Sequence, residues 1–120
     1  MLDHIALKVA SYAKSKQFYV QALEPLGYKL VMEFGASAGL GKDGKPDFWI
    51  AGGAATIPPL HVAFSSPDRR TVDAFHRAAL AAGGKDNGAP GLRTHYHPSY
   101  YAAFVLDPDG NNVEAVCHRP

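Results

Sequence analysis

Two histidines occupy matching places in two similar stretches of this sequence. His4 stands in the stretch DHIAL at 3–7, and His61 stands in the stretch LHVAF at 60–64. Alternation in both stretches is typical of a strand with one buried face, and it puts each histidine opposite the bulky aliphatic residues. Two imidazoles on equivalent strand faces suggest metal ligands, whereas one half-buried histidine on a strand is more often a hydrogen-bonded structural residue.

A second group of reactive side chains follows Asn87. The segment from 87 to 100 is long for a connection, contains three prolines or glycines near its start, and carries Arg93, His95, Tyr96, His97 and Tyr100. Loops of this length without secondary structure of their own are often functional. We interpret the segment as a rim or lid over a site, with Arg93 and His95 as substrate contacts and His97 as a catalytic residue.

Tyr101 begins the next predicted strand and is expected to donate a hydrogen bond to an oxygen bound at the site. Two other interpretations of the segment stay open. His95 and His97 are spaced like a metal-binding pair, although the carboxylate that such a pair needs does not follow until Asp107. The segment is equally typical of a Tyr- and His-rich stretch that fills the edge of a core or a dimer contact.

The elements that must position these residues repeat along the chain. At an offset of 57 residues (61 minus 4), identical residues coincide: His4 with His61, Ala6 with Ala63, Phe18 with Phe75, Ala22 with Ala79, Leu23 with Leu80 and Gly27 with Gly84. Such self-similarity indicates a repeated structural unit. The chain is therefore interpreted as two modules within one domain, roughly 1–57 and 58–120.

Each module is expected to contain one strand, one helix and three further strands. Ser11 and Asp68 are N-cap residue types, and each precedes an apolar stripe with helical spacing. The predicted strands are 2–9, 28–34, 37–41 and 47–51 in the first module and 60–65, 85–87, 101–106 and 112–118 in the second. The order β-α-β-β-β, repeated once, predicts an α+β fold.

This order and three stretches of sequence resemble the vicinal oxygen chelate superfamily, which includes glyoxalase I, extradiol dioxygenases, bleomycin-binding proteins and fosfomycin-resistance transferases. The stretches are DHIAL at 3–7, LHVAF at 60–64 and FVLDPDGNNVEA at 104–115, of which the last is the most specific. The resemblance covers nearly the whole chain. It implies that the two βαβββ modules form a cup-shaped, partly open eight-stranded sheet.

In that superfamily the metal ligands project from the first and last strands of each module into the concave face. The resemblance therefore implies that His4, His61 and Glu114 bind a divalent metal. Alignment of the two Asp-Gly turns puts Phe48 opposite Glu114, so Phe48 is expected to face the cup as a substrate contact and Trp49 to pack under a helix. Phenylalanine cannot bind a metal, and this departs from the fourth ligand position of glyoxalase I.

Two histidines and a carboxylate leave open positions for water and a substrate, as catalytic sites do. This set suits Fe(II), and Mn(II), Zn(II), Ni(II) and Co(II) also accept it. The resemblance implies a metal-dependent enzyme of the glyoxalase or dioxygenase type, a lyase, isomerase or dioxygenase, which binds an oxygen-rich substrate through vicinal oxygens. The alternatives are a non-catalytic protein that sequesters a small molecule, as bleomycin-binding relatives do, and a fold with a vestigial site.

The composition excludes other classes of partner. With 12 basic and 11 acidic residues, a net charge of +1 and no long run of like charge, the chain is not expected to bind nucleic acid or a membrane. The single cysteine, Cys117, fits a reducing compartment, and the N-terminal sequence does not resemble a signal peptide, so a cytoplasmic location is expected. Because one module is only half a cup, we expect a homodimer, with the site within one chain or shared between two.

Overall fold

The predicted order of elements is present twice in the computed structural model, which describes residues 1–120. The first module contains β1 (Ile5–Val9), α1 (Tyr12–Ala22), a short 3-10 helix η1 (Glu24–Leu26), β2 (Lys29–Phe34), β3 (Ser37–Lys42) and β4 (Lys45–Gly52). The second contains β5 (His61–Ser65), α2 (Arg69–Ala81), β6 (Lys85–Leu92), β7 (Tyr101–Leu106) and β8 (Asn112–Cys117). The α+β fold of two repeated modules is confirmed.

Each module forms its own four-stranded sheet, and the strand order is the same in both. The orders are β1-β4-β3-β2 and β5-β8-β7-β6. The first and last strands of each module pair in parallel, and the other neighbours are antiparallel. No strand of one sheet pairs with a strand of the other, so β1 and β5 each keep one unpaired edge and the sheets are not closed into a barrel.

The two helices begin at the predicted capping residues. The Ser11 side chain accepts a hydrogen bond from the Lys14 backbone N–H at 3.3 Å, and Asp68 accepts one from the Thr71 N–H at 2.7 Å. Both contacts satisfy a backbone donor that has no partner inside the helix. Neither helix is long and apolar enough to cross a membrane.

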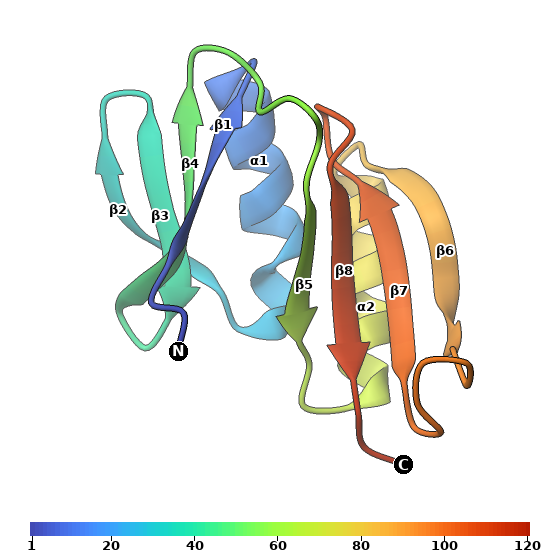
Figure 1. Ribbon diagram of the computed structural model, residues 1–120. Coiled ribbons are helices and arrows are strands. Elements are labelled where there is room, and N and C mark those ends of the chain that lie inside the picture. The colour runs from blue at the N-terminus through green and yellow to red at the C-terminus, as the bar shows by residue number, and fades with distance from the viewer.

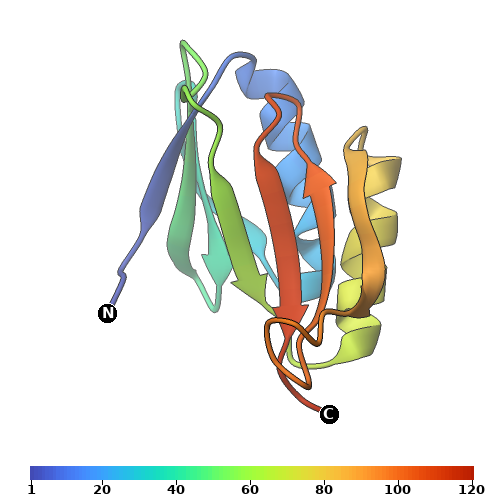
Figure 2. The same cartoon turned by 45° about the vertical axis from the view of Figure 1, so that its right-hand side comes forward.

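A single core lies between the sheets and the helices. Figure 1 shows α1 and α2 on the same side of the two sheets, and Figure 2 shows the first sheet turned toward its edge with the helices still behind. Phe48 joins the modules, because its ring lies 4.8 Å from the Tyr19 ring and 5.3 Å from the Phe64 ring. The opposite side of each sheet, which no helix covers, is called the open face below.

The turn in the most specific stretch of sequence has a structural role. The carboxylate of the buried Asp107 accepts hydrogen bonds from the backbone N–H groups of Asp109 and Asn111, from the Asn111 side chain, and from the Tyr19 hydroxyl on α1. The Asn111 side chain in turn accepts from the Leu60 N–H at 2.7 Å, just before β5. The turn thus fixes the start of β5 and ties the second module to the helix of the first.

Strand β6 is longer than expected. The sequence pattern predicts a strand that ends at residue 87 and a connection after it, but β6 continues to Leu92 with register shifts at Gly88 and Gly91. Glycine and proline in this strand weaken the strand pattern in the sequence, and they fit the bulged backbone. The remaining loop is short and closed, because the Arg93 N–H donates to the Tyr100 carbonyl oxygen at 2.7 Å.

Candidate functional site

The centre of the candidate site is a contact between β5 and β8. These strands are parallel neighbours, with Ala63 paired to Glu114, so His61 lies two residues before the partner of Glu114 on the same open face. The His61 Nε2 and Glu114 Oε1 atoms are 2.7 Å apart. The Glu114 side chain is 1% exposed and the His61 side chain 54% exposed. A buried carboxylate therefore holds a histidine that faces solvent.

Tyr100 completes this cluster. Its hydroxyl donates a short hydrogen bond to Glu114 Oε2, so both carboxylate oxygens have a partner. Burial, followed by the hydrogen bond to Glu114, raises the pKa of Tyr100 to about 12, and the hydroxyl therefore keeps its proton near neutral pH. The Tyr100 ring also packs edge-on against His118, at 5.1 Å between centroids.

The structure turns the Tyr101 side chain away from this cluster, although the sequence predicts that Tyr101 donates a hydrogen bond at the site. The Tyr101 hydroxyl donates to Asp73 of α2 at 2.7 Å, and the Arg69 guanidinium lies 5.2 Å from its ring centroid. Tyr101 thus faces the helix, while its neighbour Tyr100 reaches Glu114. Side chains alternate along a strand, so a shift of one residue moves a tyrosine to the other face. The alternation could have identified Tyr100, because Phe104, four residues later, pairs with Glu114.

The expected orientations of Phe48 and Trp49 are reversed. Phe48 is 1% exposed and packs in the core, although it also borders the larger cavity described below. Trp49 pairs with Ala6, which follows His4 by two residues. In the second module, Glu114 pairs with Ala63, which follows His61 by two residues. Trp49, not Phe48, is therefore the counterpart of Glu114 on the first sheet. Tryptophan offers no metal ligand either, so the departure from glyoxalase I stays.

His4 does not join the cluster within one chain. Its Nδ1 atom lies 2.7 Å from Asp3 Oδ1, and its side chain is 57% exposed. No three side chains of His, Cys, Asp or Glu lie close enough together to hold a metal ion. A cavity of about 740 Å³ nevertheless has both His4 and His61 in its lining. The structure brings His61 and Glu114 together, whereas the third predicted ligand, His4, contacts Asp3 instead.

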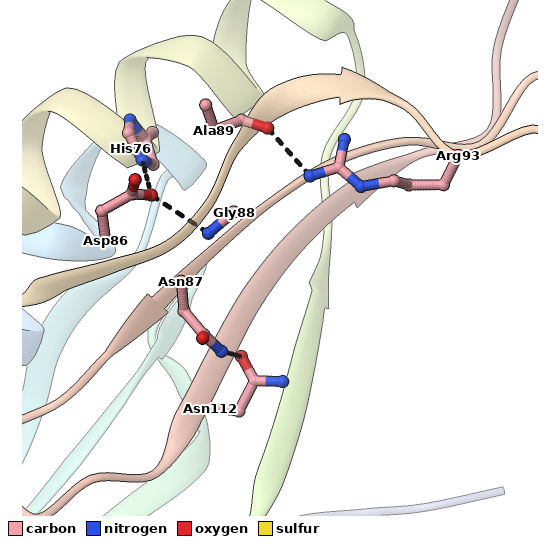
Figure 3. Close-up of polar contacts among 7 residues, drawn as sticks. All are labelled: His76, Asp86, Asn87, Gly88, Ala89, Arg93 and Asn112. Atoms are coloured by element: carbon pink, nitrogen blue, oxygen red, sulfur yellow. Dashed lines mark hydrogen bonds and ion pairs between the residues drawn. The ribbon is translucent and has the colours of Figure 1, made fainter.

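Arg93 lies on the same face as Glu114. Its guanidinium is 5.3 Å from the ring centroid of Phe104, the β7 residue that pairs with Glu114. Its Nη atoms donate to the carbonyl oxygens of Ala89 and Gly91, both at 2.9 Å, and Figure 3 shows the first of these contacts. These bonds hold the bulged end of β6, so Arg93 has a structural task whether or not it also binds a substrate.

The histidines of the loop after β6 do not contact Glu114 themselves; they pack against residues that lie next to the cluster. His95 packs against Tyr96, with ring centroids 4.0 Å apart, and Tyr96 lies 5.0 Å from Tyr100. His97 lies 5.7 Å from His118, and its Nδ1 accepts from the Ser99 N–H at 3.0 Å. The loop thus contacts His118, just after β8, and reaches Glu114 through Tyr100. None of its histidines lines the cavity that His4 and His61 share.

Other polar contacts anchor β6 at the edge of the second sheet. The His76 Nε2 atom lies 3.0 Å from Asp86 Oδ1, which connects α2 to β6, and the Asn87 side chain donates to Asn112 on β8 at 3.2 Å (Figure 3). Asn112 is the register partner of His61. These contacts hold β6, the edge strand at the far side of the second sheet from His61, against α2 and β8.

The donor atoms at the cluster fit part of a metal site. Nitrogen and oxygen ligands lie about 2.1 Å from a metal ion, so two neighbouring ligands are about 3 Å apart at an octahedral ion and about 3.4 Å apart at a tetrahedral zinc ion. His61 Nε2 and Glu114 Oε1, which are 2.7 Å apart, are within hydrogen-bond distance of each other and would separate slightly to bind one metal ion. Tyr100 holds the second carboxylate oxygen, as outer partners of metal ligands commonly do. A metal ion bound here would have two protein ligands from this cluster, and a third would have to come from elsewhere.

Comparisons with known proteins agree with the fold. The family model described as "Glyoxalase/Bleomycin resistance protein/Dioxygenase superfamily" matches residues 1–115. The structure of a glyoxalase/bleomycin resistance protein from Albidiferax ferrireducens T118 is similar, with 27% identity, 98% of both chains covered and a TM-score of 0.81. That of a family enzyme from Burkholderia phytofirmans PsJN has 22% identity, 98% of both chains covered and a TM-score of 0.74. Among curated proteins, none matches this chain.

Proposed function

Because this chain belongs to the glyoxalase, bleomycin resistance protein and dioxygenase superfamily, we propose that it is a metal-dependent enzyme acting on a small oxygen-rich molecule. The observation that carries the proposal is the contact of His61 and Tyr100 with the buried carboxylate of Glu114. The carboxylate is paired with His61 and Tyr100, and a divalent metal beside it would supply the positive charge that favours a buried carboxylate. The reaction is of the glyoxalase or dioxygenase type, catalysed by a lyase, an isomerase or a dioxygenase.

Each residue of the cluster has a task in this proposal. His61 and Glu114 bind the metal, and Tyr100 orients the carboxylate through its protonated hydroxyl. A bound divalent ion acts as a Lewis acid toward two adjacent substrate oxygens. Arg93 and His95 contact the substrate from the loop side, and His97 takes part in proton transfer there. Trp49 at the fourth position has neither a ligand nor a basic group, which favours a site with three protein ligands.

The third ligand in this proposal is His4 of a second chain. His4 directly precedes β1, His61 begins β5, and each of these strands has an unpaired edge. An unpaired edge has free backbone groups that can pair with another chain. Pairing of β1 with β5 of a partner in a two-fold homodimer brings His4 toward the partner's copy of the His61–Glu114 pair. Such an isologous arrangement produces two equal sites per dimer.

The proposal also places the protein in the cytoplasm. Cys117 is buried and forms no disulfide, which agrees with a reducing compartment.

Metal analysis of protein purified without a histidine tag tests the proposal. We expect about one divalent ion per chain and near-complete loss of metal in Glu114→Ala, because the remaining ligands are too few for a stable site. Glu33→Ala is the matched control, since Glu33 is a carboxylate that contacts Tyr12 and Lys16 of α1, away from the cluster. Metal retained by Glu114→Ala at the level of the Glu33→Ala control would refute the site.

A further inference from the structure

The two sheets carry opposite combinations of side chains at equivalent positions of their open faces. On the second sheet, Glu114 of β8 pairs with Phe104 of β7, and the His61 ring lies 6.2 Å from the Phe104 ring. On the first sheet, Trp49 of β4 pairs with Gly39 of β3. Gly39 of the first sheet therefore corresponds to Phe104 of the second sheet, and Trp49 of the first sheet corresponds to Glu114 of the second.

Gly39 leaves the space that the Trp49 indole occupies. A Cβ atom at residue 39 would lie 2.8 Å from Trp49 Cζ2 and 2.9 Å from two other atoms of the ring. Such distances are shorter than van der Waals contact, so any larger residue would displace the indole. The indole therefore lies across the backbone of β3 and not upright from β4.

Phe34 extends this aromatic surface toward the edge strand. Its ring is within 10° of parallel to the Trp49 ring, with the centroids 6.5 Å apart. The Phe34 residue is 64% exposed, so a large apolar ring on β2 is in contact with solvent. Phe34 thus continues the exposed aromatic surface beyond Trp49, the aromatic residue that lines the hollow described next.

A hollow of about 260 Å³ adjoins the indole. Its lining is apolar apart from two residues, and it consists of His4, Ala6, Ser37, Trp49, Ile50 and Ala51. An apolar cavity of about 150 Å³ already holds benzene, so this hollow has room for one substituted aromatic ring. The lining has no carboxylate, lysine or arginine, so it favours an uncharged ligand.

We propose that Trp49, Gly39 and Phe34 form a platform that binds a planar, uncharged aromatic ring, with His4 and Ser37 at the border of the bound ligand. The inference rests on the proposed function in one respect, because it assumes that the bound ring is part of the substrate that reacts at the His61–Glu114 site. Binding of the ring itself needs no metal. Trp49 acts here as a specificity determinant, in the position where the second sheet has its carboxylate.

Two matched alcohols test the platform on full-length protein from which metal has been removed. Benzyl alcohol carries a planar ring, and cyclohexylmethanol carries a saturated ring of similar size. Trp49 is the only tryptophan, so its indole N–H resonance in an NMR spectrum reports on this site alone. We expect saturable shifts with benzyl alcohol and about fivefold weaker binding of cyclohexylmethanol, the difference that stacking on an aromatic ring provides.

Two variants and one control complete the test. Trp49→Leu keeps an apolar side chain without a flat ring, and it should bind benzyl alcohol about fivefold more weakly by ligand-observed NMR. Gly39→Val should weaken binding similarly, because the new side chain displaces the indole. Ala13→Val, which adds a branched side chain to the exposed surface of α1 on the helix side of the sheets, should leave the affinity unchanged.

Equal affinities for the two alcohols, or an unchanged affinity in Trp49→Leu, would overturn the inference. So would an indole resonance that responds to protein concentration and not to benzyl alcohol, because a second chain would then cover the platform. The metal content of untreated protein is measured separately. Ring binding in a protein that never contains metal would keep the platform and refute the proposed function.

Discussion

Replacing Tyr100 with phenylalanine should weaken both the fold and the metal site. The change removes only the hydroxyl that donates to Glu114 Oε2, and Glu114 is 1% exposed, so one oxygen of a buried carboxylate loses its donor. A hydrogen bond to a charged group contributes about 1.5–3 kcal/mol. Tyr100 itself is only partly buried, and water can replace part of this bond, so we expect a loss of about 1–2 kcal/mol in the free energy of unfolding.

Urea unfolding of metal-free protein, followed by circular dichroism, measures this loss as a lower midpoint with an unchanged slope. The pH dependence of the stability shows whether the Tyr100 hydroxyl proton is responsible. Because the pKa of Tyr100 is raised to about 12 from an ordinary value near 10, the stability it contributes is complete below pH 10 and is lost as the pH rises toward 12. The difference between the parent protein and Tyr100→Phe should therefore be constant below pH 10 and shrink above it.

The same variant should bind metal about 10- to 100-fold more weakly, the usual effect of removing an outer partner of a ligand. Tyr96→Phe is the control, since Tyr96 is in the same loop, is 62% exposed, and packs against Tyr100 through its ring. Its effect on stability should stay within about 0.5 kcal/mol, as for most surface substitutions. If Tyr100→Phe unfolds and binds metal like Tyr96→Phe, the hydroxyl does not hold Glu114 and this reasoning is wrong.

Three further predictions concern the fold, the helix side and the assembly. Asp107→Ala should lower the free energy of unfolding by about 3 kcal/mol, because it removes the carboxylate that accepts hydrogen bonds from both Tyr19 and Asn111. Urea unfolding measures this loss, and a loss under about 1 kcal/mol would contradict it. Tyr101→Phe should cost about 1 kcal/mol through its lost bond to Asp73 but leave the metal content unchanged, and metal analysis showing a loss would return Tyr101 to the site. Light scattering at micromolar concentration should find twice the chain mass of 12.8 kDa, and a metal-containing species of single mass would exclude the shared site.

The order of elements was predictable because it depends on local patterns that occur twice. Ser11 and Asp68 precede the two helices as capping residues, and the alternation around His4 and His61 marks the first strand of each module. These signals need no knowledge of tertiary contacts. The end of β6 escaped prediction because Gly88 is at φ 151° in a bulge, where the alternation is interrupted.

The orientations at the site were harder to predict because each depends on a shift of one residue. Alignment of the two Asp-Gly turns assumed equal hairpins, but β3 and β4 are joined by a two-residue turn at Asp43 and Gly44, both at positive φ, with a register shift between Leu40 and Gly41. That shift exchanges the faces of Phe48 and Trp49. The distance between His4 and the His61–Glu114 pair depends on how the two sheets pack, which no local pattern encodes.

The most direct test of the central claim is metal binding by a mixed dimer. Chains carrying His4→Ala and chains carrying Glu114→Ala are produced together with different affinity tags that contain no histidine, and the mixed dimer is isolated. If His4 of one chain completes the His61–Glu114 pair of the other, one of the two sites keeps all three ligands. The account predicts about one metal ion per mixed dimer and none in either dimer of identical variant chains. A mixed dimer without metal, beside a parent protein that contains it, would contradict the shared site.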